Sequence, residues 1–422
     1  MDKKIKIGLI GLGTVGSGVF KTLRNFQHVE IVKIAVKNIN KPRDIAGLDN
    51  SILTDNPFEI AADPDIDILV ELIGGVEPAF DIIKTAIENG KHIVTANKEL
   101  LAKKGKELFD FAESHNRVVL YEAAIAGGIP LIMPIKTILA GNKINKIEAI
   151  VNGTTNYILT KMDVQGASYN DVLKEAQELG YAEADPTGDV EGFDAAYKIA
   201  TLATITFKKR INIDKIYREG ITKIRPQDMK AANDLGYKIK LIASGRIDNE
   251  GRADVRVHPM LVSKNTTLAH TDYVTNAVSL SGHPIGDITL SGPGAGEFPT
   301  ASSVVGDILS ISSELPNSDY ILPMMRYRYN EEAKTVDISE TFNKYYISIN
   351  AKNNIGVIGK IGTVCAEYGI SLASIVQKCV SEDNTADITV ITEIASEKAM
   401  QDAIKLIEQD GNIVNSLIRV QI

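Results

Sequence analysis

The sequence predicts an α/β protein with an N-terminal doubly wound parallel sheet, a central α+β domain and a C-terminal ferredoxin-like domain. Three observations carry this prediction. Strand and helix patterns alternate over residues 1–130, as in a parallel sheet covered by helices on both faces. Mixed strands and helices follow over residues 131–320. A βαββαβ order closes the chain over residues 345–422, after an expected linker at residues 321–344.

Composition narrows the class of protein. At 422 residues the chain is long enough for two or three domains. The net charge of −8, with 46 basic and 54 acidic residues, argues against a nucleic-acid-binding protein. No apolar run reaches the roughly 20 residues of a membrane helix. Two cysteines, Cys365 and Cys379, cannot form a disulfide framework or a zinc site, so we expect a cytoplasmic protein.

The first strand and helix enclose a glycine motif. Residues 5–10 are an apolar strand, and GLGTVG at residues 11–16 fits G-x-G-x-x-G before a helical pattern. Such glycines let the backbone approach a pyrophosphate at a helix N-terminus, which predicts a Rossmann-type dinucleotide site. The expected cofactor-binding residues here are Gly11, Gly13, Thr14, Val15 and Gly16.

The second strand, residues 30–36, indicates which dinucleotide binds. NAD-specific folds usually place an acid after this strand, where this chain has Asn38, preceded by Lys37 and followed by Arg43. The nearby cations and the missing acid would suit the negatively charged 2′-phosphate of NADP(H). We therefore expect NADP(H) to bind, with NAD(H) tolerated. The alternative is that both cations are surface charges.

Three further strands complete the first sheet. Residues 65–75 are a strand that ends in two glycines, and residues 91–96 and 117–122 are the next two, with helices between them. Lys98 comes just after one of these strands. It can face a nicotinamide and its substrate, or it can be a surface lysine in the first turn of a helix.

The central domain begins with helices and continues with strands. Its expected helices lie at residues 131–141, 154–163, 168–180 and 194–207, and its expected strands at 143–151, 237–247, 252–263 and 276–282. A glycine-rich turn, Gly292 to Gly296, precedes one more helix and can bring backbone close to a ligand.

One segment of this domain is crowded with carboxylates. GYAEADPTGDVEGFDAAYK, residues 180–198, contains Glu183, Asp185, Asp189, Glu191 and Asp194 and ends on Lys198. Asp194 and Lys198 are four apart and share a face of an apolar helix. A buried pair of this kind is costly unless it is fully hydrogen-bonded or functional. A site for an ammonium group and a solvated loop with a surface pair both remain open.

With these motifs the sequence resembles homoserine dehydrogenase over nearly the whole chain. The motifs are GLIGLGTVGSGV, TANKELLA, YEAAIAGGIP, NGTTNYILT, ELGYAEADPTGDVEGFDAAYK and SGPGAGEFPTAS. The family interconverts L-aspartate 4-semialdehyde and L-homoserine with NAD(P). The resemblance implies that Glu183 and Asp194 contact the substrate, that Asp189 supports the pocket, and that Lys198 and Lys98 are catalytic lysines. It also implies that Gly296 and Lys98 contact the cofactor.

The resemblance further implies a sodium ion and a regulatory tail. The ion's ligands would be Glu122 and the carbonyls of Ile125, Gly127 and Ile129. The tail resembles an ACT domain that binds an amino acid, commonly L-threonine. Its ligand loop would contain Asn353, Asn354, Gly356 and Val357. A homodimer or homotetramer is expected.

Two other functions remain open at this stage. One is a different ACT-regulated NAD(P) oxidoreductase, acting on another amino-acid aldehyde. The other is a sensor that binds nucleotide and amino acid without turnover. Loss of Lys198 or Asp194 would mark such a sensor, and both residues are present.

Overall fold

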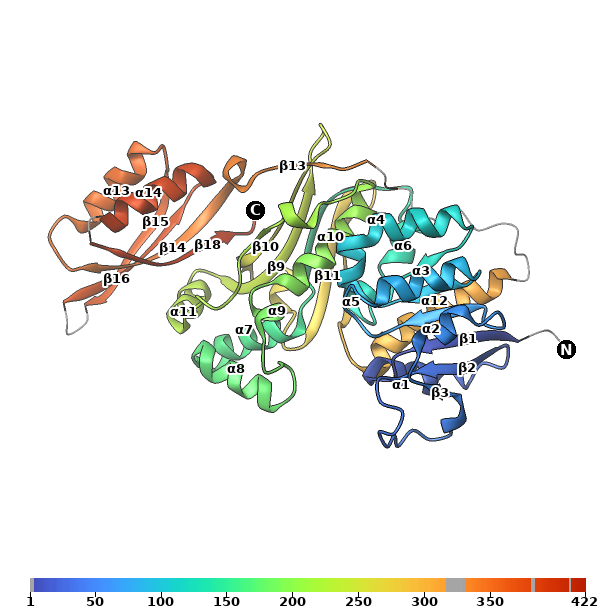
Figure 1. Ribbon diagram of the computed structural model, residues 1–422. Helices are drawn as coiled ribbons and strands as arrows, with labels where there is room; N and C mark the ends of the chain where they lie inside the picture. The colour runs from blue at the N-terminus through green and yellow to red at the C-terminus, as the bar shows by residue number, and fades with distance from the viewer. Residues whose placement is uncertain (1–3, 316–328, 330, 381–383, 410) are drawn as a thin grey trace. The chain divides into compact units, whose positions relative to one another are not determined.

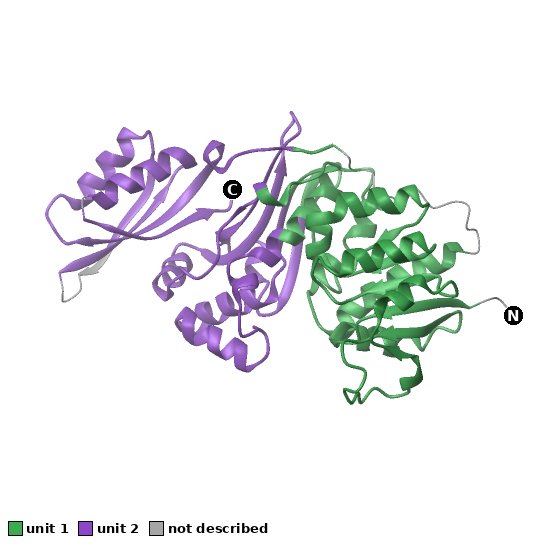
Figure 2. Ribbon diagram, viewed as in Figure 1, with its two compact units in different colours: residues 1–146, 197–214, 280–333 green, residues 147–196, 215–279, 334–422 purple. Residues whose placement is uncertain are grey.

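The computed structural model describes residues 4–315, 329, 331–380, 384–409 and 411–422. The chain forms two compact units (Figure 2): residues 1–146, 197–214 and 280–333 are unit 1, and residues 147–196, 215–279 and 334–422 are unit 2. Much of the expected linker, residues 321–328 and 330, lies outside the described residues. Within the described part of the chain, every helix is too short or too polar to cross a bilayer.

Unit 1 contains a six-stranded parallel sheet in the order β3-β2-β1-β4-β5-β6. Figure 1 labels β1, β2 and β3 of this sheet. This order confirms the doubly wound sheet predicted from the sequence. Most residues of β1, β4, β5 and β6 are buried and apolar, as in a parallel sheet covered on both faces, whereas β2 exposes Glu30. They are β1 (Ile5–Ile10), β2 (Val29–Ala35), β3 (Leu53–Thr54), β4 (Ile68–Glu71), β5 (His92–Thr95) and β6 (Val119–Leu120).

Helices cover this sheet and share its core. α1 packs against α12, and both contribute apolar side chains to the cluster that contains β1, β2 and β4. α3 packs between α2 and α4. The helices are α1 (Thr14–Leu23), α2 (Pro57–Ala62), α3 (Ala79–Glu88), α4 (Lys98–Ser114), α5 (Ala123–Ala126), α6 (Ile132–Lys136) and α12 (Glu297–Glu314).

A second, mixed sheet runs in the order β12-β11-β7-β9-β10-β18-β14-β16-β15. Its first strands are β7 (Lys143–Ile150), β9 (Tyr237–Ile247), β10 (Arg252–Ser263), β11 (Thr275–His283) and β12 (Gly286–Pro293). Two short strands, β8 (Tyr217–Arg218) and β13 (Lys334–Thr335), pair with β10. The helices between β7 and β9 in the chain are α7 (Gly153–Gln165), α8 (Tyr169–Glu178), α9 (Thr187–Val190), α10 (Phe193–Phe207) and α11 (Pro226–Asp234).

The last 80 or so residues form the predicted ferredoxin-like module. Its elements are β14 (Phe342–Lys352), α13 (Val357–Glu367), β15 (Leu372–Val380), β16 (Thr385–Thr392), β17 (Ala395–Ser396), α14 (Glu397–Gln409) and β18 (Ile413–Val420). α13 and α14 cover one face of its four main strands (Figure 1). The module is not separate from the preceding sheet, because β18 pairs in parallel with β10.

Candidate active site

The glycine motif of unit 1 forms a sharp turn at the carboxyl end of β1. Gly11 has a φ of +102°, a backbone conformation that side chains with a Cβ rarely adopt. A Cβ on Gly16 would lie 2.2 Å from the Gly11 carbonyl oxygen, so the first turn of α1 packs directly on the loop. The free N–H groups at the start of α1, which begins at Thr14, are where a pyrophosphate would bind.

An open groove of about 1050 Å³ lies beside this turn. It is lined by Gly11, Gly13, Lys37, Asn38, Lys41, Arg43 and Asp55, among others. Lys37 and Lys41 are exposed, so their charges are available to a ligand. The Arg43 guanidinium donates to the carbonyls of Asn38 at 2.7 Å and Lys41 at 2.8 Å, and therefore braces the loop that carries both lysines.

Sequence patterns do not predict a role for Lys41 or Asp55 in this groove. Exposed loop lysines are common, and Asp55 follows β3, far from the expected position of an acid. The charged side chains that line the groove are Lys37, Lys41, Arg43 and Asp55, so the groove has a net positive charge.

Lys98 is the first residue of α4 and is held by its neighbours. The Asn97 side chain caps α4 by accepting from the Leu100 amide at 3.1 Å, and it donates to the Gly75 carbonyl at 2.6 Å. Buried Glu71 accepts from the amides of Ile73 and Gly74, which shapes the glycine loop after β4. The ends of β4 and β5 are thus tied together beside Lys98.

Gly296, the other expected cofactor residue, precedes α12 in unit 1. It has a φ of +117° and is the N-cap of that helix. Lys21 of α1 pairs with Glu297 at 2.7 Å, so the start of α12 lies against the helix that follows the glycine motif. This places Gly296 near α1, the helix that follows the glycine motif.

In unit 2, Asn152 gathers the acidic segment. Its side-chain amide donates to Asp189 at 2.7 Å and to Asp194 at 3.0 Å. Its side-chain oxygen accepts from the Thr155 amide at 2.9 Å, which caps α7. One residue therefore starts a helix and brings together two carboxylates from different elements.

The five carboxylates have different surroundings. Asp194 is only 6% exposed, so the surface-pair alternative is wrong for this residue. Asp189 and Glu191 are half-buried, whereas Glu183 and Asp185 are exposed, as a solvated loop would be. Hydrogen bonds from the side chain and then from the backbone amide of Thr187 hold the pKa of the Asp185 carboxyl below its ordinary value.

The start of the segment is anchored to α7. The Thr154 hydroxyl donates to the Tyr181 carbonyl at 2.6 Å, and the rings of Tyr157 and Tyr181 pack with centroids 4.9 Å apart. Gln177 donates to the Glu183 carbonyl at 3.0 Å. These contacts leave the Glu183 side chain free of the core and fix its backbone.

Asp194 and Lys198 occupy the first two turns of α10, as the sequence predicts. The helix begins at Phe193, and Lys198 is half-buried. Asp194 can orient the lysine that follows it by one turn.

Glu122, an implied sodium ligand, is buried in unit 1 and directly precedes α5. Its carboxylate accepts from the amides of Leu131 at 2.5 Å, Ile132 at 2.7 Å and Met133 at 2.8 Å, and so caps α6. The Gly127 carbonyl accepts from the Ser303 hydroxyl at 2.6 Å. No group of three His, Cys, Asp or Glu side chains that could hold a metal occurs among the described residues.

The segment from Glu122 to Ile129, which includes α5, offers backbone carbonyl oxygens to a sodium ion, and the Glu122 carboxylate also accepts from three backbone amides. Near it, burial lowers the pKa of Lys136 to about 8 and raises the pKa of Asp307.

The implied effector loop connects β14 and α13. Gly356 has a φ of +88° and is the N-cap of α13. Asn353 accepts from the Gln377 side chain at 3.0 Å, while Asn353, Asn354 and Ile355 are exposed. The loop is thus presented to solvent at one end of the ferredoxin-like module.

Comparison with known proteins gives one consistent family. A homoserine dehydrogenase family model matches residues 130–309, the NAD-binding domain model of homoserine dehydrogenase matches residues 11–122, and an ACT domain model matches residues 345–412. The homoserine dehydrogenase of Neisseria gonorrhoeae is 41% identical over 417 residues, which are 96% of this chain and 95% of that protein.

Solved structures that resemble this chain belong to the same family. The crystal structure of a homoserine dehydrogenase from Thiobacillus denitrificans matches with a TM-score of 0.93 at 39% identity, covering 99% of this chain and 98% of that one. A hyperthermophilic archaeal homoserine dehydrogenase in complex with NADPH matches with a TM-score of 0.64 at 26% identity, covering 75% of this chain and 99% of that one.

Proposed function

Since this chain belongs to the homoserine dehydrogenase family and is an NAD(P)-dependent oxidoreductase with an ACT domain, we propose that it reduces L-aspartate 4-semialdehyde to L-homoserine, with NADP(H) preferred over NAD(H). One observation carries the substrate assignment. Asn152 holds Asp189 and Asp194 together directly before Lys198 in the chain. Two carboxylates in a partly dry site suit the ammonium group of an amino-acid aldehyde.

The chain's residues supply binding and a proton. The reduced nicotinamide supplies a hydride to the aldehyde carbon when it is bound. Lys198 gives a proton to the aldehyde oxygen, which would otherwise become an alkoxide. Asp194 orients Lys198, and Lys98 at the start of α4 stabilises the developing negative charge. In the oxidation of homoserine, neutral Lys198 takes the hydroxyl proton back.

The carboxylates divide the work of substrate binding. Asp194 is buried and held by Asn152, so it fixes the position of the ammonium group. Asp189 completes this pair, and exposed Glu183 approaches the substrate from the loop. Hydrogen bonds to a charged group contribute about 1.5–3 kcal/mol each, enough to give specificity for an amino acid.

The preference for NADP(H) rests on the groove in unit 1. Lys37 and Lys41 are exposed on a loop braced by Arg43, and Asn38 stands where an acid would favour NAD. The archaeal relative bound to NADPH supports the same cofactor. NAD remains an accepted second cofactor, because Asp55 can bind a ribose hydroxyl.

Four further features belong to the proposal. A sodium ion is held by Glu122 and the backbone carbonyls of Ile125, Gly127 and Ile129. An amino-acid effector such as L-threonine binds the exposed loop from Asn353 to Val357. The enzyme is a cytoplasmic homodimer or homotetramer. The domains are residues 1–130, 131–320 and 345–422, with a linker at residues 321–344 between the second and the third.

Steady-state kinetics of L-homoserine oxidation test the cofactor assignment. Lys37→Met should raise the KM for NADP by about tenfold, since a charged contact is lost, and leave the KM for NAD nearly unchanged. Lys106→Met is a matched control, because Lys106 pairs with Asp110 on the surface of α4. An equal change for both cofactors would contradict recognition of a 2′-phosphate by Lys37.

A further inference from the structure

A short segment of unit 2, residues 217–222, lies between the ACT module and the acidic segment. We call it the β8 segment. β8 pairs in parallel with β10, and the Glu219 amide donates to the Val257 carbonyl at 2.8 Å. Side chains alternate along a strand, so Tyr217 and Glu219 point to one side and Arg218 to the other.

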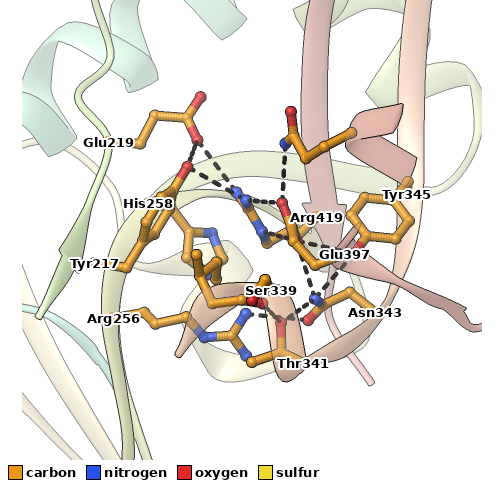
Figure 3. A network of polar contacts seen from close by, with 12 residues as sticks. Tyr217, Glu219, Arg256, His258, Ser339, Thr341, Asn343, Tyr345, Glu397 and Arg419 are labelled. Atoms are coloured by element: carbon orange, nitrogen blue, oxygen red, sulfur yellow. Dashed lines mark hydrogen bonds and ion pairs between the residues drawn. The ribbon is translucent and has the colours of Figure 1, made fainter. Parts of the chain in front are cut away.

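On one side the β8 segment is fixed by Arg419 of β18 (Figure 3). Arg419 is 1% exposed and donates to the Glu219 carboxylate at 3.1 Å and to the Tyr217 hydroxyl at 3.3 Å. It also donates twice to Glu397, at 2.9 Å and 2.5 Å. Glu397 is itself 2% exposed and accepts from the Tyr345 hydroxyl at 2.8 Å.

This group of residues ties the ACT module to the β8 segment. Buried charges require well-formed partners, so Arg419 has little freedom to move without breaking several bonds. A buried network of this kind rigidifies the elements that contribute to it.

On the other side the β8 segment contacts the acidic segment. The Arg218 guanidinium lies 3.3 Å from the centroid of the Phe193 ring and donates to the Glu191 carbonyl at 2.6 Å. The Ile221 amide donates to the Val190 carbonyl at 2.9 Å. These contacts fall on the residues between Asp189 and Asp194.

Gly220 allows the β8 segment to lie very close to the acidic segment. A Cβ at Gly220 would lie 2.4 Å from the Val190 carbonyl oxygen and 2.8 Å from the Glu191 Cα. Both are backbone atoms, which cannot swing aside as a side chain can. The two chain segments can therefore lie this close only because residue 220 has no side chain.

We propose that Arg218 is a positioning residue, and that the β8 segment acts as a strut that transmits the state of the ACT module to the substrate carboxylates Asp189 and Asp194. The strut is anchored by Arg419 at one side and meets the turn after Asp189 at the other. This inference rests on the proposed substrate role of these carboxylates. It assigns residues 217–222 to substrate affinity without any contact to the substrate.

The first test adds one methyl group. Gly220→Ala should raise the KM for homoserine by about tenfold or more and lower kcat, because a misplacement near 1 Å can cost on the order of 10²-fold. The KM for NADP should stay within about twofold of wild type, since the groove in unit 1 is untouched. Gly306→Ala, at an exposed position of α12 with open space around it, is the control.

The second test removes the stacked cation. Arg218→Met should raise the KM for homoserine, and Arg218→Lys should recover part of the affinity, because lysine keeps a cation over Phe193 and a donor for Glu191. Lys223→Met makes the same change of charge at an exposed site nearby and should leave the KM unchanged. An unchanged KM in folded Arg218→Met and Gly220→Ala would overturn the strut.

The third test addresses the contact of Tyr217 with Arg419 and the proposed substrate role of Asp194. Tyr217→Phe removes the hydroxyl that accepts from Arg419 and should raise the KM for homoserine by about threefold, which corresponds to a weak hydrogen bond. An unchanged KM would overturn the link to the ACT module. Asp194→Asn separates the two proposals: if it leaves the KM unchanged, the proposed function fails. If only Asp194→Asn raises the KM, the strut alone fails.

Discussion

Replacing Asn152 with serine separates two functions of one side chain. Serine is as good an N-cap as asparagine, so α7 should keep its start. Serine cannot reach both carboxylates, so Asp189 and Asp194 lose the donors now at 2.7 Å and 3.0 Å. The variant should fold and bind NADP(H) but hold its substrate poorly.

The size of the effect follows from these contacts. A hydrogen bond to a charged group contributes about 1.5–3 kcal/mol, and two are lost, although solvent that enters the site will replace part of this. A net loss of about 3 kcal/mol in transition-state stabilisation corresponds to a fall in kcat/KM of roughly 10²-fold. The free energy of unfolding should fall as well, because the same two hydrogen bonds are lost from the folded enzyme, but by less than in a variant that also loses the cap.

The assay is the initial rate of L-homoserine oxidation, followed by the absorbance of the reduced nicotinamide. Chemical denaturation of the same samples measures stability. Asn152→Ala is the companion variant, which should lose the rate and, in addition, about 1 kcal/mol of stability through the missing cap. A serine variant with the kcat/KM of wild type would refute the role given to Asn152.

Three further predictions concern catalysis, pH and stability. Lys198→Met should lower kcat by about 10²- to 10⁴-fold while NADPH binding, measured by calorimetry, is kept; retained turnover would exclude it as the proton donor. Burial and a nearby arginine lower the pKa of His92 from 6.5 to about 4. Between these pH values the unfolded state binds more protons than the folded state, so stability falls as the pH drops from 6.5 to 4. The free energy of unfolding should fall by about 2 kcal/mol between pH 7 and pH 5 because of His92. Denaturation curves of His92→Asn should not show this fall. A variant with the same pH dependence of stability as wild type would contradict the role of His92. Arg419→Met leaves Glu397 buried without its cation and should destabilise the protein by about 3–5 kcal/mol, whereas Arg252→Met, at an exposed pair, should cost less than about 1 kcal/mol; similar losses of thermal stability in both would contradict the burial argument.

Much of the fold followed from local patterns in the sequence. The glycine motif, the apolar strands of unit 1 and the βαββαβ order of the tail each depend on residues close together in the chain. Asp194 and Lys198 share α10, so their common placement was predictable from helical spacing.

What could not be predicted depends on contacts between distant residues. Asn152 meets Asp189 and Asp194 from 37 and 42 residues away, and the sequence showed it only as a turn before a helix. An asparagine at the start of a helix can cap the helix with its side-chain oxygen and still donate from its side-chain amide. This property of asparagine is the signal that could have identified Asn152.

The ACT module gives a second example. The βαββαβ pattern identifies the module, but strand patterns do not name pairing partners. The pairing of β18 with β10 and the burial of Arg419 between Glu219 and Glu397 appear only in three dimensions. Glu122 likewise caps α6 through three backbone amides, a role that spacing does not show.

The most direct test of the central claim is the initial rate of L-homoserine oxidation by the wild-type enzyme and by Asp194→Asn, with NADP and NAD side by side. We predict turnover that is faster with NADP, and an Asp194→Asn variant that still binds NADPH but has a strongly raised KM for homoserine. A folded wild-type protein that binds NADPH without oxidising homoserine, or a variant with unchanged kinetics, would contradict the account.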